Sequence, residues 1–73
     1  LFLPRLREKV PSITRREEIL SMLIALKQDN KSIAELLAIA PRSVLMNRHR
    51  FRQKIGMDTE YSLENFIEDL LKD

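Results

Sequence analysis

Residues 29–56 constrain the fold more than any other stretch of this chain. Asp29 can cap a helix over residues 30–37, because its carboxylate can accept the free backbone amides of a first turn. Pro41 suits the first turn of a second, longer helix, and Gly56 is a natural stop for it. Only three residues remain between the two helices. The stretch therefore predicts two helices that are joined by a tight turn and cross closely.

The second of these helices is strongly basic. Between Glu35 and Asp58 the chain has five Lys or Arg residues and no acid, whereas residues 58–73 hold one basic and six acidic residues. The formal net charge of only +2 therefore hides a sharp separation of charge along the chain. A basic helix followed by an acidic end favours a localised surface for a polyanion. The alternative is an ordinary solvated helix face.

The rest of the chain also predicts helices, and no stretch alternates apolar and polar residues as a half-buried strand would. Residues 2–9 can form a lead helix. Thr14 and Glu17 have the spacing of a capping box for a helix that ends near Lys27. Ser62 can cap a last helix.

The expected fold class is all-α, a bundle of four to five helices with a helix-turn-helix inside it. Seventy-three residues fit one small domain. Its expected parts are a lead helix within residues 1–12, a helix-turn-helix core over residues 13–57 and a C-terminal helix over residues 62–72.

The basic helix has two predicted sides. Val44, Phe51 and Ile55 recur with helical spacing and form a core stripe. A short helix, a tight turn and a longer basic helix are the parts of a helix-turn-helix DNA reader. On the side of the helix opposite the core stripe, residues at the front can reach bases. Cations on the two flanks of that side can reach phosphates. The predicted DNA-binding residues are Lys31, Arg42, Ser43, Leu45, Met46, Arg48, His49, Arg50, Arg52 and Lys54.

Several of these residues also have a structural alternative. Leu45 and Met46 either contact thymine methyl groups or pack on a neighbouring segment. His49 either bonds to phosphate or base or is incidental. Lys31 either holds a phosphate together with helix N-terminal amides or is a plain surface charge. Asn47 is expected on the packing side as a structural hydrogen-bonding residue.

The central residues resemble the LuxR-type (GerE-like) helix-turn-helix domain of bacterial transcription regulators. The resemblance spans residues 13–57 without a gap. It is carried by Ile13-Thr14-Arg15-Arg16-Glu17, by Lys31-Ser32-Ile33-Ala34, and by Ser43-Val44-Leu45-Met46-Asn47-Arg48-His49-Arg50-Phe51-Arg52-Gln53-Lys54-Ile55-Gly56. The Pro-Arg-Ser-Val start and the flanking helices are similar to the version at the C-termini of Bacteroidetes sensor and tetratricopeptide-repeat proteins.

This resemblance implies sequence-specific binding of double-stranded DNA, in the bacterial cytoplasm, by the output domain of a transcription regulator. It also implies sensor or repeat domains elsewhere in a longer chain, and the start at Leu1 favours a fragment. The sequence departs from the family at Ser32, at Ala38 and Ala40 in the turn, and at Leu45, where the family commonly has Lys. Leu45 cannot donate a hydrogen bond to a base, so the base preference is expected to differ.

The last helix carries a wide apolar stripe that includes Phe66. The family dimerises through this helix, so the same stripe is expected both to close the core and to pair two copies. Phe66 and Leu70 are expected in the core, and Ile67 and Leu71 at an exposed edge. The predicted dimerisation residues are Leu63, Ile67, Leu70 and Leu71.

Other classes of protein have little support. The chain has no Cys, one His, no glycine-rich phosphate loop and no nucleophile–base pair, so no enzyme activity, cofactor or metal is expected. No apolar run approaches the ~20 residues that span a bilayer. Two rivals remain. One is the promoter-binding region of a sigma factor, and the other is a helical interaction module that uses its last helix and binds no DNA.

Overall fold

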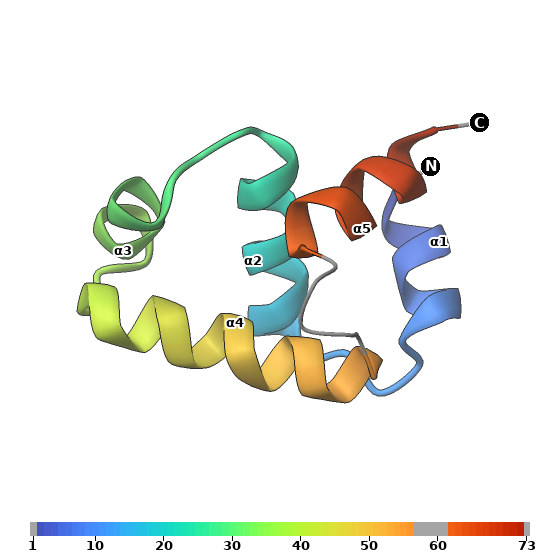
Figure 1. Ribbon diagram of the computed structural model, residues 1–73, viewed down its shortest axis with the longest axis horizontal. Coiled ribbons are helices and arrows are strands. Elements are labelled where there is room, and N and C mark those ends of the chain that lie inside the picture. Colours follow the sequence, from blue (N-terminus) through green and yellow to red (C-terminus); the bar gives the residue numbers. More distant parts are fainter. Residues whose placement is uncertain (1, 57–61, 73) are drawn as a thin grey trace.

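Five helices make up the described part of the chain, and no strand occurs in it (Figure 1). The computed structural model describes residues 2–56 and 62–72, so positions 1, 57–61 and 73 of the predicted segments lie outside the described residues. The all-helical prediction is confirmed. The helices are α1 (Phe2–Lys9), α2 (Arg15–Ala25), α3 (Asn30–Leu37), α4 (Pro41–Ile55) and α5 (Leu63–Leu71).

The longest helix, α4, lies along one edge of the molecule, and the other helices pack on one side of it (Figure 1). At one end of the molecule, α3 packs against α4. In the middle, α2 contacts both α4 and α5. At the other end, α1 packs against α5. One long face of α4 is thereby left open to solvent.

Helix starts follow the predicted caps. The Thr14 hydroxyl accepts from the Glu17 amide at 3.1 Å, and the Thr14 amide donates to the Glu17 carboxylate at 2.9 Å, which completes the capping box. The side chains of Asp29 and Ser62 each accept the backbone amide three residues further on. Ala40 precedes α4 without a side-chain cap. Local side-chain chemistry therefore determines where three of these helices begin.

Helix ends use the left-handed backbone region. Gly56 ends α4 with φ of 78°, as predicted. Ala38 ends α3 with φ of 57°, and Lys27 follows α2 with φ of 64°, so α2 ends at Ala25, before the predicted position. A side chain with a Cβ atom is strained in this region by about 1 kcal/mol relative to Gly. The turn between α3 and α4 is therefore formed at a cost in stability.

Replacing Ala38 by Gly is expected to raise the free energy of unfolding by about 1 kcal/mol, because the strain at φ of 57° is removed. Gly56→Ala is the matched control with the opposite sign. A Cβ atom at position 56 meets no heavy atom within 4 Å, so the substitution adds only backbone strain. Urea unfolding of the parent and both variants measures the two changes. A lower stability of Ala38→Gly would contradict the expectation.

The core lies between the helices, where α5 packs against α1 and α2 and where α4 packs against α2 and α3. Its buried side chains come from every helix, and they are Leu6, Val10, Leu20, Ile24, Ile33, Ala34, Val44, Phe51, Leu63, Ile67 and Leu70. The predicted core residues Val44 and Phe51 are fully buried, and Ile55 is half-buried at the edge of the cluster.

The expected exposure of Ile67 is wrong, because its side chain is only 1% exposed. Leu63, Ile67 and Leu70 form the centre of the apolar stripe on α5 and all three point into the core. The edges of the stripe are Phe66, which is half-buried, and Leu71, which is 48% exposed. Of the four predicted dimerisation residues only Leu71 is therefore accessible. The centre of the apolar stripe on α5 is therefore covered by the same chain.

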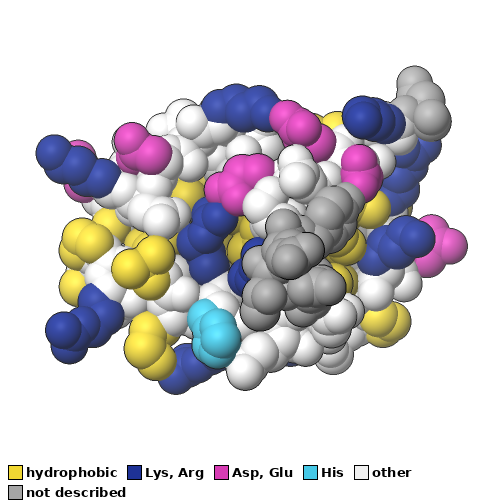
Figure 2. Space-filling view, in the orientation of Figure 1, with side chains coloured by type: hydrophobic (Ala, Val, Ile, Leu, Met, Phe, Trp, Pro, Cys, Tyr) yellow, Lys and Arg dark blue, Asp and Glu magenta, His cyan; other side chains and the backbone are white. Residues whose placement is uncertain are grey.

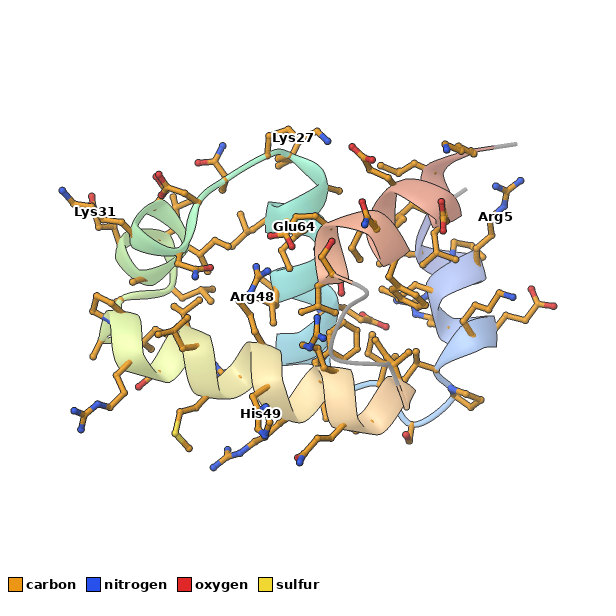
Figure 3. The ribbon with its side chains drawn as sticks, viewed as in Figure 1. Arg5, Lys27, Lys31, Arg48, His49 and Glu64 are labelled. Atoms are coloured by element: carbon orange, nitrogen blue, oxygen red, sulfur yellow. The ribbon has the colours of Figure 1, made fainter. Side chains whose placement is uncertain are left out.

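Polar contacts attach α5 to α1, to the segment after α2 and to α4 (Figure 3). Arg5 of α1 donates to backbone carbonyls at the C-terminal end of α5, where a cation is favoured by the helix dipole. Lys27, just after α2, pairs with Glu68 at 2.6 Å. Arg48 of α4 pairs with Glu64 at 2.6 Å. The acidic helix thus neutralises cations of the same chain.

Candidate nucleic-acid interface

The solvent face of α4 is the candidate site. Val44 and Phe51 turn inward, so the residues on the opposite side of this 15-residue helix turn outward. Leu45 is 56% exposed and Met46 is 47% exposed. The residues of this face that the structure describes as exposed are Arg42, Leu45, Met46, His49, Arg50 and Gln53. The predicted front of the helix is confirmed as a solvent-accessible surface.

Three cations border this face. Arg42 lies in the first turn of α4, Arg50 lies two turns further on, and Lys31 lies in the first turn of α3. Among the described residues, no carboxylate forms a salt bridge with any of the three. Lys31 and His49 point away from the body of the molecule in Figure 3. Ser43 is half-buried near the start of α4.

The face combines charge with apolar surface. In Figure 2, hydrophobic side chains gather at the end where α3 meets α4, and Lys and Arg side chains surround them. The single His lies on the same side, along the open edge of α4. Acidic side chains in this view lie along the upper side, where they alternate with Lys and Arg side chains, and at the right-hand end. The lower edge of the molecule in this view, along α4, therefore shows cations and the histidine but no acidic side chain among the described residues.

Arg48 does not belong to this open face. Its guanidinium points from α4 to α5, where one nitrogen lies 2.8 Å and 2.6 Å from the two carboxylate oxygens of Glu64 (Figure 3). The side chain is only 17% exposed. Arg48, a predicted DNA-binding residue, is therefore paired within the fold and does not lie on the open face. Its helix position is correct, but a partner on another helix draws the side chain inward.

Lys54 and Arg52 are also turned towards the protein. Lys54 donates to the Glu17 carboxylate at 2.8 Å and to the backbone carbonyl of Ser12 at 3.2 Å. Arg52 is half-buried, and its charge contributes to the field at Glu64. The C-terminal half of α4 therefore uses these cations within the fold. The N-terminal half and Arg50 retain the accessible positive charge.

A hollow of about 170 Å³ adjoins the open face between the start of α2 and the middle of α4. Arg16 and Arg50 both line it, so two cations from different helices face one small space. Arg16 is not among the predicted DNA-binding residues. The capping box was the available signal, because it places the residues between Thr14 and Glu17 in an exposed first turn. The remaining lining residues are Thr14, Glu17, Leu20 and Asn47.

Two cations on the packed side of α4, Arg48 and Lys54, lower the pKa values of two carboxylates. Partial burial raises the pKa of Glu64, but the hydrogen bond and charge of Arg48 outweigh burial and hold the pKa below its ordinary value of 4.5. Partial burial likewise raises the pKa of Glu17, and Lys54 and the Thr14 amide outweigh it. Both carboxylates are therefore ionised at neutral pH, and both pairs are intact there.

Acid is expected to remove the stabilisation that these pairs supply. A carboxylate whose pKa is lower in the folded chain stabilises the fold above its unfolded pKa, and this contribution is lost as the pH falls through the folded pKa. Glu64→Gln should lower the free energy of unfolding at pH 7 by up to about 1 kcal/mol. Urea unfolding at pH 7 and below pH 4 should show the parent and this variant converging. A difference in free energy of unfolding between the parent and the variant that stays constant with pH would contradict the expectation.

Neither a metal centre nor a membrane span is apparent in the described residues. No group of three His, Asp or Glu side chains in ranges 2–56 and 62–72 is placed to hold a metal ion. None of the helices there is both long enough and apolar enough to cross a membrane. Comparisons with known protein families, curated proteins and solved structures returned no match to this chain. The geometry of the open face of α4 is therefore the basis for a functional proposal.

Proposed function

We propose that this chain binds double-stranded DNA through α3, the following turn and α4, which together act as a helix-turn-helix of LuxR type. The observation that carries the proposal is the open face of α4, on which Arg42 and Arg50 form no salt bridge with a carboxylate among the described residues. In this role the chain is the DNA-binding output domain of a bacterial transcription regulator that works in the cytoplasm.

The dimensions of α4 support this use. Fifteen helical residues extend over about 22 Å, and a helix fits the major groove of DNA, which is about 12 Å wide. Arg42 lies at the end of α4 that enters a groove first in such motifs. Arg50 and Lys31 lie on the borders of the face, where they can reach phosphates on the two walls of the groove.

The distribution of ion pairs also favours binding of DNA to the open face of α4. Glu64 and Glu17 neutralise Arg48 and Lys54 on the packed side of α4, so these cations do not attract DNA to the wrong face. On the open face, Arg42 and Arg50 form no salt bridge with the described residues. Because α5 is part of the core, we propose that one copy of the chain binds each DNA site, without a dimer contact through α5.

Salt-dependent binding tests the proposal. A labelled pool of random duplexes should bind to the chain, and the logarithm of the binding constant should fall linearly with the logarithm of salt concentration. Three phosphate contacts by Lys31, Arg42 and Arg50 correspond to a slope of roughly −3 between about 50 and 200 mM salt. Fluorescence anisotropy measures it. Absence of binding at the low-salt limit would refute the proposal and favour a helical interaction module.

A further inference from the structure

The open face of α4 has an apolar centre. Leu45 and Met46 are 56% and 47% exposed, and they contribute nothing to the core. Helix geometry places Leu45 between Arg42 and His49, which lie three residues before and four residues after it. The same geometry places Met46 between Arg42 and Arg50, each one turn away. Each apolar side chain is thus bordered along the helix by cationic or imidazole groups.

These two side chains suit contact with an apolar group, because neither has a hydrogen-bond donor for a base or a phosphate. In the major groove of DNA the apolar group is the C5-methyl of thymine. We infer that Leu45 and Met46 select sites with thymine methyl groups opposite them. This inference rests on the DNA binding proposed above.

Energetics favour this use of the exposed area. Leu45 and Met46 expose apolar surface to water in the free protein, and contact with a methyl group removes area on both partners from water. The neighbouring arginines hold the helix to the DNA backbone, so the position of the apolar contacts along the groove is set by ionic contacts on either side. Specificity and affinity then come from different residues of one helix face.

Replacing thymine by deoxyuridine tests the inference, since base pairing is kept and only the methyl group is lost. The best-bound duplex selected from a random pool is made with each thymine replaced in turn. For the parent chain, we expect a loss of about fourfold in affinity at each contacted thymine. Positions without contact should show no change.

Variants assign each methyl group to its side chain. Leu45→Ala should abolish the effect of deoxyuridine at one position, and Met46→Ala should abolish it at another. Leu71→Ala is the matched control, because Leu71 is 48% exposed but lies on α5, and it should keep the full pattern. All three side chains are largely exposed, so circular dichroism should show the same helix content in each variant.

The possible outcomes separate this inference from the function on which it rests. Salt-dependent binding with equal affinity for thymine and deoxyuridine duplexes would overturn the methyl contacts and leave DNA binding standing. Selected sites without thymine would likewise overturn the methyl contacts and leave DNA binding standing. Absence of any duplex binding would overturn both. Sensitivity to deoxyuridine that survives in the Leu45→Ala and Met46→Ala variants would assign the methyl contacts to other residues and also overturn the inference.

Discussion

Replacing both Arg42 and Arg50 by Glu is expected to lower the affinity for duplex DNA by about 100-fold or more near 100 mM salt, because two phosphate contacts become repulsive. The salt slope should become shallower by about two units. Both side chains are exposed, and neither pairs with a carboxylate in the described part of the chain, so the fold should be kept. Anisotropy titrations at several salt concentrations, with circular dichroism in parallel, measure both quantities.

A matched control separates a local interface from overall charge. Lys9→Glu combined with Lys72→Glu changes the net charge by the same amount, at the ends of α1 and α5 and away from the open face of α4. This control should lose much less affinity than the Arg42 and Arg50 variant. Equal losses would mean that the chain attracts DNA only through its net charge, and the assigned interface would then be wrong.

Ile67→Glu is expected to unfold the chain, or to cost several kcal/mol of stability, because an ionised carboxylate would replace a side chain that is 1% exposed. A domain of this size has only a few kcal/mol of stability to lose. Thermal and urea unfolding followed by circular dichroism measure the effect. The result distinguishes an α5 that closes the core from one that mainly presents a dimer contact.

Leu71→Glu is the control on the same helix. Leu71 lies one turn after Ile67 and is 48% exposed, so its replacement should change the free energy of unfolding by no more than about 0.5 kcal/mol. A stably folded Ile67→Glu variant would contradict the position of α5 in the core. In that case Ile67 would again be a candidate for contact with a second copy.

Local signals allowed much of the fold to be predicted from the sequence. The Thr14–Glu17 box, the Asp29 cap and Gly56 each act through backbone groups within four residues, and each is present in the structure. Pro41 likewise marks the start of α4. The open face of α4 followed from helical spacing for the same reason, since Val44 and Phe51 determine which side is buried.

Contacts between distant parts of the chain could not be predicted in this way. The partner of Arg48 is Glu64, sixteen residues away on α5, and the partner of Lys54 is Glu17, thirty-seven residues away on α2. No local pattern reports such a pairing, so the sequence alone predicts both cations as DNA-binding residues. Ile67 was misplaced for a related reason, because the width of an apolar stripe does not reveal which of its residues another helix will cover.

The contact between Arg5 and the end of α5 has a consequence for how the domain can be attached to other molecules. It brings the first and last helices together, so both ends of the described chain leave the molecule at one corner (Figure 1). That corner lies away from the open face of α4. A fluorophore, a surface anchor or a fused protein can therefore be joined at either end without obstructing that face. Donor and acceptor dyes at the two ends would lie close together only while α1 and α5 remain docked, which provides an optical reporter of folding.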